Sequence, residues 1–244
     1  MPRSKSAILA YHSISHAGSV ISTPPELFEA QMECLASLGV PVVPLGSLSA
    51  ADGAVALTFD DGYRDFIEEA LPVLLRFRLP ATVFVVAGRC GGRNDWDQAG
   101  YGSIPGLPLM DWDQIREAAR AGIEIGAHTY SHPDLRRLRP EDVAGEFARC
   151  QAEIRAHTGQ HVQALAYPYG RSNASVRRVA GRYFRWACGA RLDFVRPGAD
   201  PLDLPRVDVY YLRDLKRFRE VALGEDLYLR IRRALRTVRQ AIRG

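Results

Sequence analysis

Two adjacent carboxylates stand where an apolar stretch of the sequence ends. Residues 57–63 read LTFDDGY, so Asp60 and Asp61 follow a strand-like run and precede a glycine. The ends of strands are where parallel α/β folds place catalytic groups. Adjacent side chains diverge there, so one carboxylate can bind a metal while the other remains beside a bound water. The structural alternative is an Asp-Gly turn in which Asp61 caps the next helix.

Two histidines follow a second apolar stretch. Residues 125–133 read IGAHTYSHP, and the four-residue step from His128 to His132 lets both rings face one ion across a single turn. Two imidazoles and one carboxylate leave coordination positions open for water and substrate, which is typical of a hydrolytic rather than a structural metal site. A pair of histidines at this spacing is weak evidence by itself.

A third apolar stretch ends in the sequence LAYPYG at residues 165–170. Pro168 and Gly170 break the strand, and backbone N–H groups that turn outward there can bind an oxyanion. An aromatic-proline turn without a function explains this segment better when it is taken alone. The order of all three segments, each at the end of a strand-like run, favours a common catalytic site.

The elements that must position these residues alternate along the chain, which predicts parallel strands joined by crossover helices. The predicted strands are Ala7–His12, Val40–Pro44, Val55–Asp60, Ala81–Val86, Ile123–Ala127, Val162–Tyr167, Arg185–Gly189 and Pro205–Val209. The predicted helices are Pro24–Leu38, Tyr63–Phe77, Asp111–Ala121, Pro140–Thr158, Ser172–Arg182 and Asp226–Ile242. The glycine-rich stretch from Gly88 to Leu109 predicts a long loop over the site.

Length and composition predict a single soluble catalytic domain. A chain of 244 residues suits one α/β barrel, and 47% hydrophobic with 25% charged residues is typical of soluble globular proteins. No apolar run reaches the roughly 20 residues that span a bilayer. We expect a barrel at residues 1–225, followed by a basic amphipathic helix at residues 226–244.

The N-terminus and the cysteines favour a cytoplasmic protein. No apolar segment with a small-residue cleavage site follows Met1. The four cysteines, Cys34, Cys90, Cys150 and Cys188, form no C-x-x-C pair, so we expect reduced and mostly buried thiols. The net charge of +4 is spread along the chain without an aromatic-basic module, which argues against a nucleic-acid partner.

The combination of T-F-D-D-G, H-[ST]-x-x-H and a later P-Y-G resembles the polysaccharide deacetylase family. This family is also called carbohydrate esterase family four and includes the nodulation-type chitooligosaccharide deacetylase homology domain. The resemblance covers residues 7–209 and implies an α/β fold, a distorted and incomplete (β/α) barrel of about seven strands. It also implies metal-dependent removal of an N-acetyl or N-formyl group from an amino sugar in a polysaccharide, oligosaccharide or lipid-linked glycan.

The resemblance also implies roles for individual residues. Asp60 matches the catalytic base, and the backbone N–H of Tyr169 matches an oxyanion donor. The ligands of one divalent metal match Asp61, His128 and His132. This donor set suits zinc and also accommodates cobalt, nickel or manganese. We further expect substrate contacts from three residues of these motifs: Tyr63, Tyr167 and Pro168.

The sequence departs from the family pattern at two catalytic positions. Many members carry an arginine two residues before the proline of the third motif, where this chain has Ala166, and we expect Arg206 to replace it. Many members also carry a late histidine that protonates the leaving amine, but the last histidine here is His161. We expect His12 to take that role, because it ends the first strand on the same rim as Asp60. A histidine bonded to a neighbouring loop is the structural alternative.

This chain resembles one subgroup of the family in two features, the Tyr-His pair at the first strand and the Leu-Pro-Arg segment before Val207. An N-terminal Tyr-His of this kind resembles that of deacetylases acting on poly-N-acetylglucosamine. Two other functions stay open at this stage. The missing arginine and late histidine would fit a catalytically impaired, metal-containing carbohydrate-binding barrel. The same site would also serve an O-acetyl esterase, because only the leaving group differs.

The C-terminal segment carries an apolar stripe beside a dense set of arginines. The stripe is formed by Leu227, Ile231, Leu235, Val238 and Ile242. The arginines are Arg230, Arg232, Arg233, Arg236, Arg239 and Arg243. The stripe can pack on the barrel, form a dimer seam, or rest on anionic lipid at the inner face of the cytoplasmic membrane.

Overall fold

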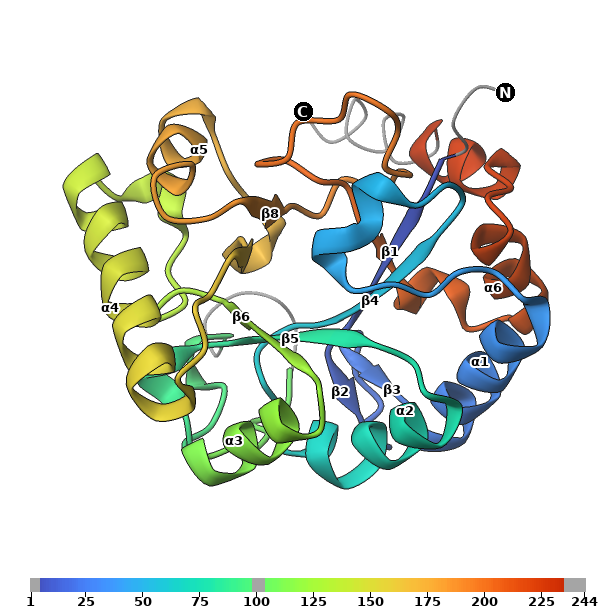
Figure 1. Ribbon diagram of the computed structural model, residues 1–244, viewed down its shortest axis with the longest axis horizontal. Coiled ribbons are helices and arrows are strands. Elements are labelled where there is room, and N and C mark those ends of the chain that lie inside the picture. The colour runs from blue at the N-terminus through green and yellow to red at the C-terminus, as the bar shows by residue number, and fades with distance from the viewer. Residues whose placement is uncertain (1–4, 98–103, 235–244) are drawn as a thin grey trace.

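The central element is a seven-stranded parallel sheet that curls into an incomplete barrel (Figure 1). The computed structural model describes residues 5–97 and 104–234. The strands are β1 (Ala7–Tyr11), β4 (Val55–Phe59), β5 (Ala81–Val85), β6 (Glu124–Ala127), β7 (Ala164–Ala166), β8 (Trp186–Cys188) and β9 (Val207–Asp208). Their order is β8-β7-β6-β5-β4-β1-β9, so the first strand lies inside the sheet and the last one at an edge. The predicted barrel of about seven strands is confirmed.

Besides a helical segment at residues 227–234, six helices lie around the outside of this sheet in the described part of the chain (Figure 1). They are α1 (Pro25–Leu38), α2 (Leu71–Phe77), α3 (Trp112–Arg120), α4 (Pro140–Thr158), α5 (Ala174–Ala180) and α6 (Leu215–Ala222). Their boundaries follow local signals. Asp111 and Gln114 form a capping box at the start of α3, and Gly39 and Gly159 end α1 and α4 in left-handed conformations.

Two predicted elements differ from the structure, and one observed helix was not predicted. The segment Val40–Pro44 forms only one bridge, from Val42 to Val55, because prolines at positions 41 and 44 cannot donate ladder hydrogen bonds. The helix expected at Tyr63–Phe77 begins as a π-helical turn at Phe66–Ala70 before α2. Helix α6 was not predicted.

The strands alternate between two apolar layers. Leu9, Leu57 and Val83 belong to the layer between the sheet and the helices. Ile8, Ala56 and Phe84 belong to a smaller cluster inside the curled sheet. Because side chains point to opposite faces with a period of two, each strand contributes to both layers. The inner layer is filled mainly by small residues around Phe84, and a side chain at Gly126 would collide with that ring.

The two edge strands, β8 and β9, are separated by a gap, and the residues that precede β9 partly fill this gap. Leu204 forms a parallel bridge with Cys188. Its N–H donates to the carbonyl of Ala187 at 2.9 Å, and its carbonyl accepts from Gly189 at 2.9 Å. The bridge therefore brings the residues before β9 against β8, although the sheet itself remains open there.

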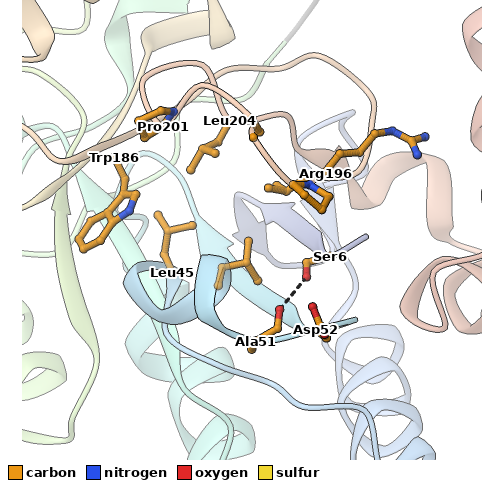
Figure 2. Close-up of a pocket in the computed structure, with 13 residues that line it drawn as sticks. Ser6, Leu45, Ala51, Asp52, Trp186, Arg196, Pro201 and Leu204 are labelled. Atoms are coloured by element: carbon orange, nitrogen blue, oxygen red, sulfur yellow. Dashed lines mark hydrogen bonds between the residues drawn. The ribbon is translucent and has the colours of Figure 1, made fainter. Parts of the chain in front are cut away.

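The barrel has a cavity at its N-terminal end as well as one at its C-terminal end. The N-terminal cavity measures about 290 Å³ and lies between Ser6, Trp186 and the 3-10 turn Leu45–Ala50 (Figure 2). Ser6 donates a hydrogen bond to the carbonyl of Ala51 at 3.4 Å on its wall. None of the residues expected to do chemistry lines this cavity.

The predicted apolar stripe of the C-terminal segment does not pack on the barrel in its described part. Residues 227–234 are helical, but Leu227 is 68% exposed and Ile231 is 52% exposed. Leu229, outside the predicted stripe, is buried instead. The other stripe residues, Leu235, Val238 and Ile242, lie outside the described residues. Among the helices that the structure describes, none is long and apolar enough to cross a membrane.

Candidate active site

The second cavity lies at the C-terminal ends of the strands and measures about 440 Å³. It is lined by seven of the residues singled out from the sequence: His12, Asp60, Asp61, His128, His132, Tyr169 and Arg206. The alternation of the strands explains part of this convergence. On β4, every second residue faces the inside of the curled sheet, and Asp60 follows Ala56 and Thr58 in this alternation. On β6, His128 follows Gly126 in the same way.

Asp61, His128 and His132 form a buried cluster whose ligand atoms lie within 4.8 Å of one another. The Oδ1 atom of Asp61 is 3.3 Å from Nε2 of His128 and 3.5 Å from Nε2 of His132. Nδ1 of His128 lies 2.8 Å from the carbonyl of Ala166 and is the nitrogen that donates to it in a neutral ring. That bond leaves the Nε2 lone pair directed toward Asp61, which is the tautomer that a metal requires.

The protonation of Asp61 and His132 also fits a cation, whereas the pKa of His128 is raised because the contacts with Asp61 and Asp60 outweigh the effect of burial. Burial would raise the pKa of Asp61, but the hydrogen bond with His128 and the charge that the histidines carry when protonated outweigh it and hold the pKa well below its usual range. Burial and the neighbouring His128 lower the pKa of His132 to about 3, so that ring stays neutral. A neutral imidazole and an ionised carboxylate are the forms that bind divalent metals. The residues present therefore fit one metal ion.

The site is built on strained backbone. Among the described residues other than glycine, five have positive φ, and Asp61 (70°), Thr129 (68°), His132 (61°) and Tyr169 (59°) are four of them. Each left-handed residue costs about 1–2 kcal/mol. Strain of this kind persists where surrounding contacts enforce it, and it gathers at functional sites.

The loop that carries His132 is held by two side chains. Oγ1 of Thr129 accepts the N–H of His132 at 3.0 Å. Glu146 in α4 accepts the N–H groups of Tyr130 at 2.9 Å and Ser131 at 2.8 Å, and also the Ser131 hydroxyl at 2.8 Å. Glu146 is not predictable from the local sequence, because nothing local relates it to a loop 15 residues earlier.

Arg206 makes a buried, two-pronged contact with Asp60. Its Nη1 and Nη2 atoms donate to the two Asp60 oxygens at 2.6 and 2.7 Å, while Nε donates to the carbonyl of Gly189 at 3.0 Å. Burial would raise the pKa of Asp60, but the charge and hydrogen bonds of Arg206 outweigh it and lower the pKa. The contact expected from the sequence is present, and it keeps Asp60 ionised and oriented.

His12 and Tyr169 both reach this cavity. Nε2 of His12 lies 3.9 Å from Oδ2 of Asp60, and its side chain is 22% exposed. The ring of Tyr169 packs edge-on against His132 at 4.7 Å between centroids, within the turn Pro168–Gly170. Gly170 must be a glycine, because φ is 63° and a Cβ there would collide with Ala190. The chemical roles expected for His12 and Tyr169 remain predictions.

Tyr63, Tyr167 and Pro168 are not among the residues that line this cavity, and the substrate contacts expected of them remain predictions. The hydroxyl of Tyr63 is buried and accepts a hydrogen bond from Asn94 at 3.1 Å. Tyr167 belongs to the outward series of β7 and donates to the carbonyl of Leu202 at 2.9 Å. The direction of Tyr167 follows from the strand alternation, because it lies one residue after Ala166, which belongs to the inner layer.

The cavity is also lined by side chains that were not expected from the sequence. They are Val20, Ile21, Ile104, Arg171, Leu192, Asp208, Tyr210 and Tyr211. The loop expected over the site contributes Ile104, and Trp96 from the same loop packs against His132 with ring centroids 4.6 Å apart and planes at 33°. Residues 98–103 of that loop lie outside the described residues.

This chain is similar to known polysaccharide deacetylases in sequence, and it is similar in fold to a solved structure. The family model described as "Polysaccharide deacetylase" matches residues 48–184. The Bacillus subtilis (strain 168) protein YxkH is 29% identical over 184 residues, which are 72% of this chain and 61% of that protein. The chitooligosaccharide deacetylase of Bradyrhizobium sp. (strain ANU 289) is 31% identical over 153 residues, 60% of this chain and 61% of that protein. The chain thus spans about three fifths of the length of these relatives.

A solved structure shows the same fold. IcaB from Ammonifex degensii superposes with a TM-score of 0.77 and 24% identity, covering 91% of this chain and 97% of that one.

Proposed function

This chain belongs to the polysaccharide deacetylase family, and we propose that it is a metal-dependent hydrolase that removes an N-acetyl or N-formyl group from an amino sugar of a glycan. The relatives bear names that fit this reaction: chitooligosaccharide deacetylase, chitin deacetylase and peptidoglycan-N-acetylglucosamine deacetylase. All of these substrates contain N-acetylated amino sugars.

One observation carries the proposal. The cluster of Asp61, His128 and His132 and the ion pair of Asp60 with Arg206 line a single cavity at the strand ends. A base beside a metal site can take the proton of the attacking water, and here the candidate base, Asp60, is next to the ligand Asp61 in sequence.

The residues of the chain divide the work of amide hydrolysis. A divalent metal held by Asp61, His128 and His132 would polarise the acyl carbonyl and lower the pKa of a water molecule. Asp60 would accept the proton of the attacking water at a carboxylate oxygen, and Arg206 would fix that carboxylate in position. The backbone N–H of Tyr169 is our candidate donor to the carbonyl oxygen as it gains negative charge.

His12 is our candidate for the proton that the leaving nitrogen needs. It lines the cavity, and its Nε2 lies 3.9 Å from the proposed base. An ester releases an alcohol instead of an amine, so an O-acetyl esterase would use the same groups with less need for this acid. The intact Asp60–Arg206 pair favours an active enzyme over an impaired carbohydrate-binding barrel.

The direct test is release of acetate from N-acetylglucosamine oligomers by protein loaded with zinc, cobalt, nickel or manganese. The wild type should release acetate, whereas Asp60→Asn should lose activity by about 100-fold or more while it retains the metal. Loading with each metal in turn identifies the one that supports turnover, and zinc is our expectation for this donor set. Metal-loaded wild type that binds glycans without releasing acetate would establish the carbohydrate-binding function instead.

A peripheral membrane contact and a cytoplasmic location remain proposals. Leu227 and Ile231 are exposed beside Arg230, which suits an anionic lipid surface. Lys5 pairs with Asp226 at 2.8 Å, so this segment starts near the beginning of β1, at the end opposite the catalytic cavity. Flotation with anionic vesicles, with and without residues 226–244, tests the contact. A full-length protein that stays unbound at low salt would contradict it.

A further inference from the structure

The cavity at the N-terminal end of the barrel has an apolar side and a polar side. Figure 2 shows the apolar side formed by Trp186, Leu45, Pro201 and Leu204. The polar side is formed by Ser6, Asp52 and Arg196. The volume of about 290 Å³ lies at the lower end of the range of small-molecule sites, about 300–1,000 Å³. The cavity therefore suits one small amphipathic molecule.

The walls of this cavity are fixed by contacts within the protein. A Cβ on Gly46 would lie 2.9 Å from the Trp186 ring, so the 3-10 turn Leu45–Ala50 packs directly on that ring. Ser6 donates its N–H to the Val195 carbonyl at 3.0 Å and accepts the Val195 N–H at 2.8 Å. A site that is already formed loses little free energy to reorganisation when a ligand binds.

The two aspartates that contact Arg196 are also bound by other cations. Lys5 contacts Asp226 at 2.8 Å, and Arg233 contacts Asp193 closely. Arg196, whose side chain is 51% exposed, lies 3.5 Å from Asp226 and 3.8 Å from Asp193. Charge-assisted hydrogen bonds are about 2.7–2.9 Å long. Arg196 is therefore the cation that these carboxylates compensate least, and it can pair with an anionic group in the cavity.

Exposed apolar side chains begin beside the polar side of this cavity. Asp226 contacts Arg196, and the next residue, Leu227, is 68% exposed. One helical turn later, Ile231 is 52% exposed. An exposed apolar surface next to an apolar cavity is typical of a site that receives an apolar or amphipathic ligand.

We propose that this cavity binds a single-chain fatty acid, with its acyl chain against Trp186 and Leu45 and its carboxylate beside Arg196. The small volume favours one acyl chain over two. Asp52 lies on the same polar side and disfavours a head group with more than one negative charge. The site lies at the opposite end of the barrel from the catalytic cavity, and it does not depend on the proposed reaction.

Fluorescence of Trp186 reports on the acyl chain directly. The chain has three tryptophans, so Trp96→Phe/Trp112→Phe leaves Trp186 as the single reporter. Bromodecanoate with bromine on its terminal carbon should quench this fluorescence saturably, and decanoate should compete with it. Decanoate should bind about 10-fold more tightly than octanoate, because two more methylenes leave water. Metal and glycan are absent from this assay, so its result is independent of turnover.

Variants of the cavity wall test each part of the ligand in the same background. Arg196→Met should weaken decanoate binding by about 3- to 10-fold and leave decanol binding unchanged. Arg76→Met is the matched control, because Arg76 is also half exposed and pairs with Glu29 away from the cavity. Ala199→Phe, which adds bulk to the wall, should abolish quenching. Urea unfolding verifies that each variant is folded.

Each of the following results would overturn the site. Quenching that does not saturate, or a folded Ala199→Phe protein that is quenched like its parent, shows that the ligand does not enter the cavity. Unchanged decanoate binding in Arg196→Met, or tighter binding of decylamine than of decanoate, refutes the pairing of the head group with Arg196. Anionic vesicles with brominated diacyl lipid supply the other source of an acyl chain. Quenching by these vesicles but not by bromodecanoate would refute the single-chain ligand.

Discussion

Removal of Arg206 should destabilise the fold strongly, because it leaves a carboxylate buried without its partner. Asp60 and Arg206 are 4% exposed, and two hydrogen bonds of 2.6 and 2.7 Å join them. Breaking a buried pair by removing one partner typically costs about 3–5 kcal/mol. The carboxyl can escape by taking up a proton, which at pH 7 and an ordinary pKa near 4 costs about 4 kcal/mol. We therefore expect Arg206→Met to lower the free energy of unfolding by about 3–4 kcal/mol.

A double-mutant cycle separates this pairing from a loss of packing. Asp60→Leu/Arg206→Met removes both charges. We expect the free energy of unfolding of this double variant to exceed, by at least about 2 kcal/mol, the value obtained by adding the losses of the two single variants. The measurement is urea unfolding at pH 7 with a chelator present, so that bound metal does not contribute.

The matched control is Arg196→Met. Arg196 is half exposed and pairs with Asp226 at 3.5 Å, so its removal should cost less than about 1 kcal/mol. An Arg206→Met effect as small as this, or additive effects in the cycle, would refute the reasoning that a desolvated ion pair positions Asp60.

Three other predictions follow from single contacts. Glu146→Ala should weaken metal binding by about 10- to 100-fold in a chelator competition assay. Glu146→Gln and Glu153→Ala, a change at a half-exposed glutamate of the same helix, should alter metal affinity much less. Wild-type affinity in Glu146→Ala would contradict the positioning role. Burial raises the pKa of Asp65 to about 6 despite hydrogen bonds from Ser13 and Ile14, so the folded state binds this proton more tightly than the unfolded state does. Stability should therefore fall by up to about 3 kcal/mol as pH rises from about 4 to 6, and urea unfolding of Asp65→Asn should lack this fall. Tyr63→Phe should destabilise the protein by about 1 kcal/mol, because the Tyr63 hydroxyl accepts a hydrogen bond from Asn94 in the interior. KM for the glycan should not change in this variant, and a raised KM would support Tyr63 as a substrate contact.

Prediction from sequence succeeded where one local pattern fixes both the element and the direction of a side chain. The alternation of apolar residues through β4 places Asp60 on the inner face, as the alternation through β6 does for His128. It failed for Val40–Pro44, where prolines limit the segment to a single bridge, and it overlooked α6, although Asp214 caps that helix. The substrate contact expected of Tyr167 neglected the same alternation that located Asp60, because Tyr167 follows the inward Ala166.

The sequence by itself determined which chemical groups the protein has and on which local elements they stand. The motifs around Asp60, His128 and Tyr169 follow the ends of strands, and strand geometry needs only neighbouring residues to act. Pairings between distant segments depend on which strands become neighbours. Arg206 meets Asp60 across 146 positions because β9 lies beside β1, and β1 beside β4, at one edge of the sheet. The same neighbourhood sets Tyr210 at the rim near Val20, a proximity that only tertiary packing decides.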